Sequence, residues 1–295
     1  MNKKMPILIL LCGLPASGKS TYAKELQFRI KNSVVFSSDA IRNELYGNEN
    51  IQGDANEVFN LMNTRVVQAL NNGYTVIYDA TNISRKSRAV IISMCPKFVK
   101  IECHIVWDTI QNCIIKDKNR TRSVGEKVID RMVKRFQAPF YDEGIDKIEV
   151  IRPDYINLDD YATKVIFNLN IPHDNSHHTL SICEHCSEAH NYINNKSSLN
   201  ENKDELSFAA LIHDIGKPYT KDFHDAQGNP TPEAHFYQHQ CVGAWMSYGF
   251  AITPYIAWLI STHMDMFLHT KYYKNLPICL KEDLDLLHEA DLNAH

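Results

Sequence analysis

Gly13-Leu-Pro-Ala-Ser-Gly-Lys-Ser20 fits the spacing GxxxxGK[ST] and follows directly on PILILLC at residues 6–12. That apolar run is shorter than the roughly 20 residues of a membrane span and leads straight into the glycine-rich segment, so we expect a buried strand. The next residues, SGKSTYAKELQFRI at 17–30, have the pattern of a helix. A strand, a glycine-rich turn and a helix in this order aim backbone N–H groups at phosphate oxygens. This stretch predicts a nucleotide-binding α/β domain.

The pattern of strand and helix continues to about residue 152. Strand-like runs at 34–38, 74–81 and 97–107 accompany an amphipathic helix pattern at 55–73. Alternation of this kind is typical of a parallel sheet flanked by helices. After Pro153 the apolar spacing becomes helical almost throughout. We therefore expect three parts: an α/β domain at 1–152, a linker at 153–171 and an all-α domain at 172–295.

Composition is that of an ordinary globular protein, with 44% hydrophobic and 22% charged residues in 295. Most of the eight cysteines lie inside apolar runs, which favours buried thiols in a reducing compartment. We therefore expect a cytoplasmic protein without a membrane segment. The net charge of −4 gives no overall bias toward nucleic acid, but basic residues gather between Lys116 and Arg135.

The glycine-rich segment predicts the binding of ATP with Mg²⁺. Lys19 is expected to reach the β- and γ-phosphates, and the Ser20 hydroxyl to ligate Mg²⁺. Asp79 ends a predicted strand and is expected to handle Mg²⁺ or its waters, the alternative being a turn or helix cap. The expected cofactor-binding residues are Gly13, Pro15, Ala16, Ser17, Gly18, Lys19, Ser20, Thr21 and Asp79.

A second carboxylate, Asp39, ends the strand-like run VVFSSD, and Arg42 follows three residues later. At the start of a helix both side chains would lie on one side. Asp39 could then accept a proton from a substrate hydroxyl while Arg42 holds a nearby phosphate. The competing interpretation is a helix N-cap at Ser38 or Asp39.

The second half of the chain carries histidines and aspartates, spread over its predicted helices. Imidazole nitrogens and carboxylate oxygens in one site suit Mn, Fe, Co, Ni or Zn. A single buried histidine is more often a satisfied core residue, but six such residues in successive predicted helices indicate a metal centre. They are His185, His213, Asp214, His239, His263 and Asp291.

Four segments, GLPASGKST, SSDAIRNELYG, VIYDATNISRKSR and NRTRSVGEKVIDRMVKRF, resemble the polynucleotide-kinase group of P-loop phosphotransferases. The resemblance implies that Asp39 is the general base for a 5′-hydroxyl and that Arg42 binds the phosphate on its 3′ side. It also implies a lid over ATP at Lys116–Arg135. One of two lid arginines, Arg120 or Arg122, would stabilise the transferred phosphoryl group. Thr81 and Asn82, in the segment Asp79-Ala-Thr-Asn, are expected to contact substrate.

Residues 172–295 resemble the HD phosphohydrolase superfamily, on the segment HDIGK with EHC upstream and EADL downstream. The resemblance assigns His185, His213, Asp214 and Asp291 to a core metal, with Asp214 able to bridge to a second metal at His239 and His263. Lys217 would contact the substrate phosphate, or else be an exposed lysine after a helix. His178 and His235 are expected near the cleft. One or two divalent transition metals such as Mn²⁺, Ni²⁺, Co²⁺ or Fe²⁺ are implied.

Together the two resemblances predict a bifunctional enzyme that heals nucleic-acid ends. It would phosphorylate a 5′-hydroxyl with ATP and hydrolyse a 2′,3′-cyclic phosphate or a terminal 2′- or 3′-phosphate. Its partners would be RNA or DNA strand ends and a separate RNA ligase; the oligomeric state stays open. The alternative is a kinase for a nucleoside or metabolite fused to an HD nucleotidase. A third possibility is an HD domain that binds a signalling nucleotide, against which the complete ligand set argues.

Overall fold

The structure is a computed structural model and describes residues 5–176, 179–196 and 201–294. It divides into two compact units. The first comprises Met1–Met132 and Pro139–Pro153, and the second comprises Val133–Ala138 and Asp154–His295.

The first unit alternates strands and helices. Its strands are β1 (Ile7–Cys12), β2 (Ser33–Ser37), β3 (Thr75–Asp79), β4 (Lys100–Val106) and β5 (Lys147–Ile151). Its helices are α1 (Lys19–Arg29), α2 (Ser38–Tyr46), α3 (Ala55–Asn71), α4 (Arg85–Met94), α5 (Ile110–Lys118), α6 (Glu126–Val133, whose last residue falls in the second unit) and the short 3₁₀ helix η1 (Tyr141–Glu143).

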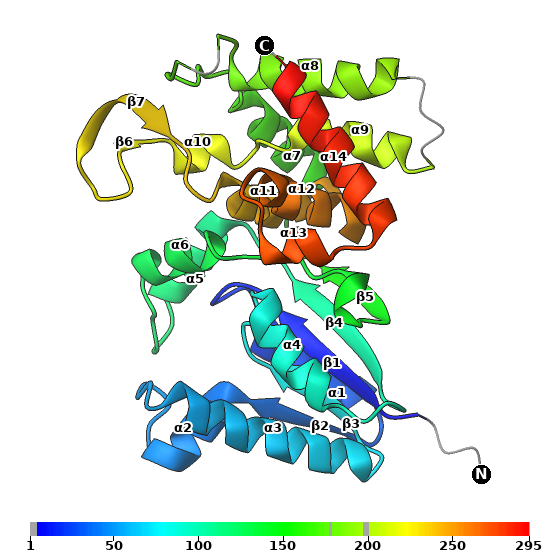
Figure 1. Cartoon of the computed structure of the whole chain (residues 1–295). Coiled ribbons are helices and arrows are strands. Elements are labelled where there is room, and N and C mark those ends of the chain that lie inside the picture. Colours follow the sequence, from blue (N-terminus) through cyan, green and yellow to red (C-terminus); the bar gives the residue numbers. More distant parts are fainter. Residues whose placement is uncertain (1–4, 177–178, 197–200, 295) are drawn as a thin grey trace. The chain divides into compact units, whose positions relative to one another are not determined.

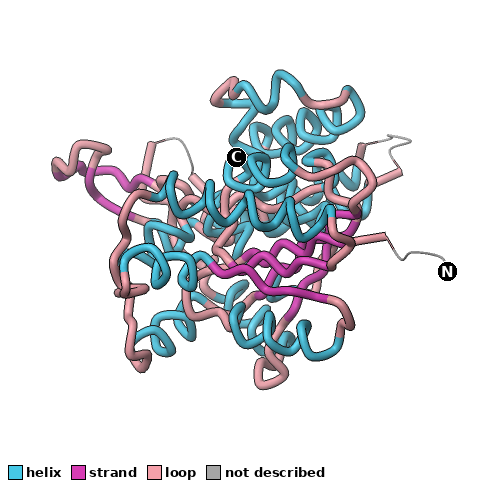
Figure 2. The backbone as a smooth tube through the Cα atoms, turned by 90° about the horizontal axis from the view of Figure 1, so that it is seen from below, coloured by secondary structure: helices cyan, strands magenta, loops and turns pink. Residues whose placement is uncertain are grey.

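The strands form one parallel sheet in the order β2-β3-β1-β4-β5 (Figure 1). Leu8 on the central strand pairs with Val76 on one side and with Ile101 on the other. Helical segments flank the strands (Figure 2), as a sheet with apolar residues on both faces requires. On one face Ile9 and Leu11 pack with Ala23 of α1. The predicted α/β architecture is confirmed.

The parallel arrangement brings three chemically active segments to the same edge of the sheet, because the carboxyl ends of parallel strands meet there. The glycine-rich turn follows β1, α2 with Asp39 follows β2, and Asp79 is the last residue of β3. Asp79 pairs in register with Ser37 of β2. The sheet therefore gathers residues as far apart in sequence as Gly13 and Asp79.

The second unit is helical, as predicted. Its elements are α7 (Leu158–Phe167), α8 (Ile182–Asn195), α9 (Lys203–Ile212), α10 (Lys217–Thr220), α11 (His239–Ser247), η2 (Tyr248–Phe250), α12 (Pro254–Phe267), α13 (Lys271–Asn275), α14 (Ile278–Asn293) and the two strands β6 (Asp222–His224) and β7 (Pro230–His235). Helix α8 packs against α9 and α14, and α12 packs against α9, α11 and α14. The helix α7 lies within the range that we expected to be a linker.

The expectation of a wholly α-helical domain needs one correction. The strands β6 and β7 pair antiparallel and form a hairpin (Figure 1). Its turn contains Gly228 at φ 87°, a left-handed conformation that glycine adopts without strain. The hairpin is short, so the alternation of polar and apolar residues that would have marked it is only a few residues long.

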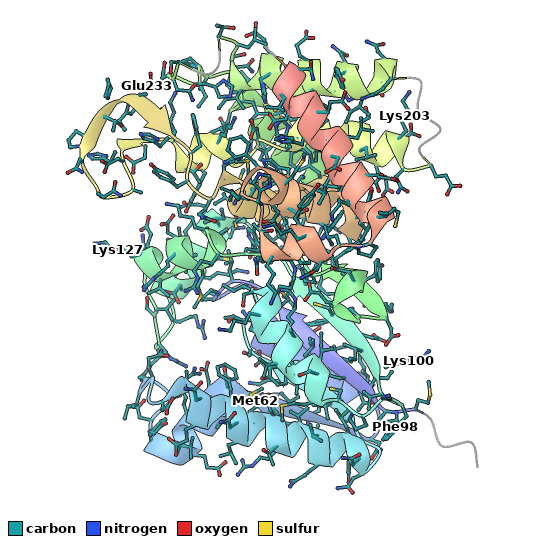
Figure 3. All side chains as sticks on the ribbon, viewed as in Figure 1. Met62, Phe98, Lys100, Lys127, Lys203 and Glu233 are labelled. Carbon is teal, nitrogen blue, oxygen red and sulfur yellow. The ribbon has the colours of Figure 1, made fainter. Side chains whose placement is uncertain are left out.

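Side chains fill the interior of both units (Figure 3). Met62 on α3, labelled there, is fully buried, whereas Lys127 on α6 is exposed. Among the described helices, none combines the length and the apolar character that a bilayer crossing requires.

Candidate nucleotide site and candidate metal centre

The glycine-rich turn is held in shape by close backbone approach. A Cβ atom added at Gly13 would lie 2.6 Å from the Val106 carbonyl oxygen and 2.8 Å from Ser17 Oγ, so only glycine fits. Gly18, just before α1, has φ 105°, which side chains rarely adopt. Lys19 is buried and its Nζ donates to the Leu14 carbonyl oxygen at 2.6 Å. The lysine is thus folded back over the turn, in the manner expected of a phosphate-binding loop.

A cavity of about 510 Å³ opens beside this turn. Most of the predicted nucleotide and substrate residues line it. They are Pro15, Ala16, Gly18, Lys19, Ser20, Thr21, Asp39, Arg42, Asp79, Thr81, Arg120 and Arg122. Gln52 and Phe59 also line the cavity and were missed, because a loop glutamine and an apolar helix residue carry no sequence signal for ligand binding.

Three predicted residues, Gly13, Ser17 and Asn82, are not among the lining residues. Asn82 is buried, and its side-chain amide donates to the Leu11 carbonyl oxygen at 2.7 Å. Gly13 N in turn donates to the Thr81 carbonyl oxygen at 3.0 Å. Asn82 therefore supports the glycine-rich turn. Its side chain does not line the cavity in which we expected it to contact substrate.

Burial acts on both charged groups that face the phosphate-binding turn. It lowers the pKa of the Lys19 ammonium, with Asp79 opposing the shift. It raises the pKa of the Asp79 carboxyl, with the Ser20 hydroxyl and Lys19 opposing. Both charges are therefore poorly solvated, and an anion near Lys19 together with a cation near Asp79 would stabilise them.

Asp39 is not the N-cap of α2, because that position belongs to Ser37, whose Oγ accepts the Asp39 N–H at 3.3 Å. The Asp39 carboxylate instead binds two arginines through the same oxygen. Arg42 Nη1 lies 3.0 Å from Oδ1 and Arg122 Nη1 lies 2.6 Å from it. One carboxylate and two guanidinium groups thus stand together in the cavity that holds Lys19.

The turn between α5 and α6 is organised by Asp117. Its carboxylate accepts the Ser123 hydroxyl at 2.7 Å and the N–H groups of Gly125 and Val124 at 2.9 and 3.0 Å. Burial raises the pKa of Asp117, but these hydrogen bonds outweigh it and lower the pKa overall. Arg120 and Arg122 are carried on this turn.

The two arginines of the turn act on different neighbours. Arg122 contacts Asp39 directly, whereas the charge of Arg120 acts on Lys19 and Asp79. The basic stretch that we expected to form one lid is also divided: residues up to Met132 belong to the first unit, and Lys134 and Arg135 belong to the second.

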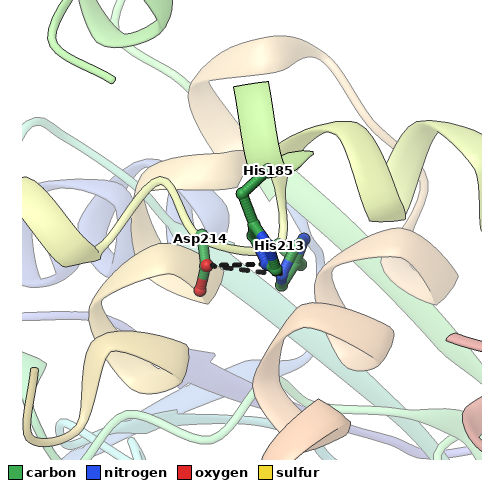
Figure 4. A group of neighbouring side chains, drawn as sticks. All are labelled: His185, His213 and Asp214. Atoms are coloured by element: carbon green, nitrogen blue, oxygen red, sulfur yellow. Dashed lines mark hydrogen bonds and ion pairs between the residues drawn. The ribbon is translucent and has the colours of Figure 1, made fainter. Parts of the chain in front are cut away.

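The six predicted metal ligands lie together in the second unit. Asp214 follows His213 at the end of α9, and Figure 4 shows both beside His185 of α8. Asp214 Oδ2 lies 3.4 Å from His213 Nε2 and 3.6 Å from His185 Nε2. Its other oxygen, Oδ1, lies 3.2 Å from His239 Nε2. The two oxygens of one carboxylate therefore face two different groups of imidazoles.

The remaining ligands complete these two groups. Asp291 Oδ1 lies 2.9 Å from His185 Nε2 and 3.4 Å from His213 Nε2. On the other side His263 Nε2 lies 3.1 Å from His239 Nε2. Two sets, His185 with His213 and Asp214, and Asp214 with His239 and His263, each offer ligand atoms within 4.8 Å of one another.

All four imidazoles are oriented by main-chain carbonyl oxygens, which can only accept hydrogen bonds, so Nδ1 carries the proton in each ring. The acceptors, with their distances from Nδ1, are Ala294 for His185 at 2.9 Å, Ala210 for His213 at 2.7 Å, Phe236 for His239 at 2.9 Å and Ile260 for His263 at 2.8 Å. The Nε2 atoms of His185, His213 and His239 then face the Asp214 carboxylate, and that of His263 faces His239 Nε2. Facing lone pairs repel unless a cation lies between them, so this donor set fits divalent metal ions.

The surroundings of the carboxylate agree with that interpretation. Both Asp214 oxygens are buried, and they contact Lys217 and the imidazoles as ion pairs without a hydrogen bond of regular geometry among the described residues. Burial raises the pKa of Asp214, but His213, Lys217 and His239 together hold it well below its ordinary value. Burial lowers the pKa of His263 to about 3, so this ring is neutral, as a ligand must be.

Lys217 is buried, which excludes an exposed lysine after the helix. Its Nζ lies 2.5 Å from Asp214 Oδ2 and 3.1 Å from Nε2 of His173, a residue that sequence reasoning missed. His173 lies in the segment before α8, and no spacing to the other histidines marks it. Burial and the neighbouring Lys217 lower the pKa of His173 to about 4.

Two further histidines were expected near the cleft. His235 is the last residue of β7, and its ring stacks on that of Tyr237 with 5.3 Å between the ring centroids. Its buried Nε2 has no hydrogen-bond partner in the described part of the chain. His178 lies outside the described residues.

Comparison with known families agrees with this division of the chain. A family model described as an AAA domain matches residues 8–139, and one described as an HD domain matches residues 175–291.

Solved structures give weaker likenesses. A chain from "Structure of Pnkp1/Rnl/Hen1 complex" is 25% identical, with 41% of this chain and 40% of that chain covered and a TM-score of 0.36. A chain from "Structure of the Pnkp1/Rnl/Hen1 RNA repair complex" is 23% identical, with 44% of each covered and a TM-score of 0.41. A gluconokinase from Sinorhizobium meliloti 1021 is 13% identical, with 52% of this chain and 85% of that chain covered and a TM-score of 0.38. The protein thus covers less than half of the first two chains, and none of these TM-scores is high enough to establish a common fold.

The phosphate-binding turn lies within the first matched range, and five of the six histidine and aspartate ligands lie well within the second, with Asp291 as its last residue. The chain therefore joins an N-terminal P-loop domain of the AAA domain family to a C-terminal HD domain.

Proposed function

We propose that this protein is a bifunctional nucleic-acid end-healing enzyme. Its P-loop domain would transfer the γ-phosphoryl group of ATP to a 5′-hydroxyl, and its HD domain would hydrolyse a 2′,3′-cyclic phosphate or a terminal 2′- or 3′-phosphate. The observation that supports it best is the cluster of Asp39, Arg42 and Arg122 in the same cavity as Lys19. A carboxylate beside two guanidinium groups suits an acceptor that carries both a hydroxyl and a phosphate.

In the proposed transfer, the acceptor oxygen bonds to the γ-phosphorus of ATP while the bond to the bridging oxygen of ADP breaks. Asp39 takes the hydroxyl proton, and Arg42 holds the acceptor's neighbouring phosphate. Lys19 and Arg120 offset charge on the transferred group, consistent with the action of Arg120 on the phosphate side of the cavity. Ser20 and Asp79 would hold the Mg²⁺ that accompanies ATP.

In the proposed hydrolase site, His185, His213, Asp214 and Asp291 would hold one cation, and Asp214 would share a second with His239 and His263. Divalent ions bound there supply an activated water and offset charge on phosphoryl oxygens. The chain's own part is to aim the imidazoles through their Nδ1 anchors and to place the Lys217 ammonium beside Asp214. A positive group at that place suits a phosphate ligand.

The kinase would give a 5′-phosphate. Hydrolysis of the cyclic phosphate to a monoester, and then of the monoester to inorganic phosphate, would give a free 3′-hydroxyl. Those are the ends that a ligase joins, so we also propose a separate RNA ligase as a functional partner.

The kinase proposal is tested by offering γ-labelled ATP with 5′-hydroxyl RNA, 5′-hydroxyl DNA and a panel of nucleosides. We expect label on the oligonucleotides and its loss in Lys19→Met. Label on nucleosides alone would refute end healing and favour a small-molecule kinase.

The hydrolase proposal is tested with an RNA ending in a 2′,3′-cyclic phosphate and with Mn²⁺ or Ni²⁺. Asp214→Ala should abolish hydrolysis while the labelled transfer from ATP continues. Equal loss of both activities would assign Asp214 a structural role instead.

A further inference from the structure

A buried ammonium stands next to the candidate metal ligands. Lys217 is 7% exposed, and its Nζ contacts Asp214 Oδ2 at 2.5 Å and His173 Nε2 at 3.1 Å. The ring of Phe236 lies under it, with its centroid 5.5 Å from Nζ. A lysine is seldom buried without partners, because desolvating its charge is costly. These three neighbours therefore define where the ammonium is held.

His173 can meet Lys217 in only one way. Its Nδ1 lies 2.9 Å from the Leu180 carbonyl oxygen, so Nδ1 donates and Nε2 presents its lone pair to the ammonium. The imidazole is 1% exposed. Its ring meets Phe236 edge-on at 5.9 Å and His185 edge-on at 5.5 Å, which fixes the plane of the ring.

The two acceptors of Lys217 differ in what they do to its charge. Asp214 is an anion, and in the proposed function it is also a ligand of the metal cations. These cations compete with Lys217 for its oxygens. His173 is a neutral acceptor, so it can hold the ammonium without cancelling the positive charge. An ammonium has three N–H donors; fixing one on His173 restrains rotation about the Cε–Nζ bond. The others are then shared between Asp214 and an anion bound beside it.

We propose that His173 is a positioning residue of the HD site: it holds Lys217 so that the ammonium donates to a phosphoryl oxygen of the substrate. The proposal rests on the phosphohydrolase function proposed above. His173 itself touches neither the substrate nor the cations, and acts through Lys217. Its chemical requirement is specific: an uncharged side chain that donates to Leu180 and accepts from Lys217.

That requirement provides a matched pair of variants. His173→Leu fills much of the same space but removes the acceptor, whereas His173→Gln offers an amide oxygen to Lys217 and an amide N–H to the Leu180 carbonyl oxygen. Lys217→Met removes the group on which His173 is proposed to act. All variants are made in the full chain and loaded with Mn²⁺, and metal content is measured for each.

The first measurement is the affinity for inorganic phosphate, by calorimetry. We expect His173→Leu to weaken it about tenfold, the loss of roughly one hydrogen bond to a charged group, and His173→Gln to stay near wild type. In the Lys217→Met background, His173→Leu should have no further effect. The second measurement is kcat/KM for 2′,3′-cyclic AMP, where the same pattern is expected with Mn²⁺ content unchanged.

Unchanged phosphate affinity in His173→Leu would overturn the proposal, and so would an equal loss in the Lys217→Met background. Loss of Mn²⁺ in His173→Leu would show that the imidazole supports the ligands instead. Should His173→Leu fail to fold, His173→Met replaces it as the apolar variant. A wild-type protein that binds phosphate but hydrolyses no phosphate ester would refute the proposed function, while the phosphate measurements would still decide the role of His173.

Discussion

Arg122 Nη1 lies 2.6 Å from Asp39 Oδ1, in the cavity that Lys19 also lines. Arg42 approaches the same oxygen at 3.0 Å. A carboxylate oxygen that already contacts two guanidinium groups has little room for a third donor. A hydroxyl that approaches Asp39 must therefore replace at least one arginine. Arg42 lies on the same helix as Asp39, whereas Arg122 lies on the turn between α5 and α6.

Replacing Asp39 by asparagine removes the proposed proton acceptor and leaves the shape of the side chain. We expect the rate of phosphoryl transfer to a 5′-hydroxyl oligonucleotide to fall about 10²- to 10⁴-fold. The affinity for ATP, measured with a fluorescent analogue, should change little because Lys19 and Ser20 are untouched. Transfer at the wild-type rate in Asp39→Asn would remove Asp39 from the reaction.

Substitutions of the two arginines on the turn between α5 and α6 should change different kinetic constants. Arg120→Gln removes a charge that acts on Lys19 and Asp79, so we expect a higher KM for ATP and a lower kcat. Arg122→Gln removes the partner of Asp39, so its main effect should be on the KM for the oligonucleotide. Lys127→Gln, at an exposed position of α6, serves as a control for loss of positive charge. Identical profiles for Arg120→Gln and Arg122→Gln would contradict this division of labour.

Metal binding should stabilise the HD domain, because the cations relieve the repulsion between converging Nε2 lone pairs. Mn²⁺ at a hundred times its dissociation constant adds ~2.7 kcal/mol to the free energy of unfolding, and EDTA should reverse the gain. His263→Gln should lower the metal content, since it removes a ligand of one of the two groups. His235→Gln removes a histidine outside both groups and should keep the full metal content. A metal content unaffected by His263→Gln would exclude the second position.

Without metal, the HD domain should lose stability in mild acid. Burial lowers the pKa of His173 to about 4 and that of His263 to about 3, from an ordinary value of 6.5. Between pH 6.5 and 4 these two histidines are therefore protonated in the unfolded chain and neutral in the folded chain, so the free energy of unfolding decreases as the pH falls. Burial also acts to lower the pKa of His213, but Asp214 and other neighbours outweigh it and raise that pKa well above its ordinary value. The contribution of His213 is therefore already complete below pH 6.5 and does not offset the loss.

The measurement is the thermal midpoint of the EDTA-treated protein at pH 7.0, 6.0 and 5.0. The double variant His173→Gln with His263→Gln should flatten the dependence. A wild-type midpoint that stays constant across this range would contradict the prediction.

The P-loop domain contains a buried ion pair whose loss should be costly. Arg88 and Glu143 form two hydrogen bonds at 2.7 Å, and Arg88 also donates to the Asn82 carbonyl oxygen at 2.9 Å. Arg88→Met leaves the Glu143 carboxylate buried without its partner, so we expect a loss of ~3–5 kcal/mol in the free energy of unfolding, read from urea denaturation. Arg88→Met combined with Glu143→Leu should lose less. An equal or larger loss in the double variant would mean that packing, and not the unpaired charge, sets the cost.

The sequence predicts the parts of this protein that depend on local pattern. The strand, turn and helix around Lys19 follow from a motif of eight residues, and the helices that carry His185 or His263 follow from apolar spacing. The alternation of strands and helices up to residue 152 was enough to predict a parallel sheet, because parallel strands need helical crossovers between them.

Long-range contacts account for what the sequence leaves out. The sequence around Asn82 does not indicate that its amide donates to the Leu11 carbonyl oxygen, seventy-one residues earlier, instead of pointing toward the cavity. The partnership of His173 with Lys217 spans forty-four residues and depends on how the segment before α8 passes α10. Ser37 could not be preferred over Ser38 or Asp39 as the cap of α2 until the end of β2 was known.

The anchors of the four imidazoles in the candidate metal centre also bear on how such a site withstands mutation. Three of the four rings are anchored by the carbonyl oxygen of the residue three positions earlier in their own segment. A point mutation can delete one of these ligands, but it cannot delete a main-chain oxygen, so the aim of each ring is inherited with the local backbone. His185 is the exception, since its anchor is the carbonyl oxygen of Ala294, 109 residues away. The orientation of the His185 ring therefore depends on how α14 ends. Substitutions near the end of α14 should change the geometry of the site more readily than substitutions near the other three anchors.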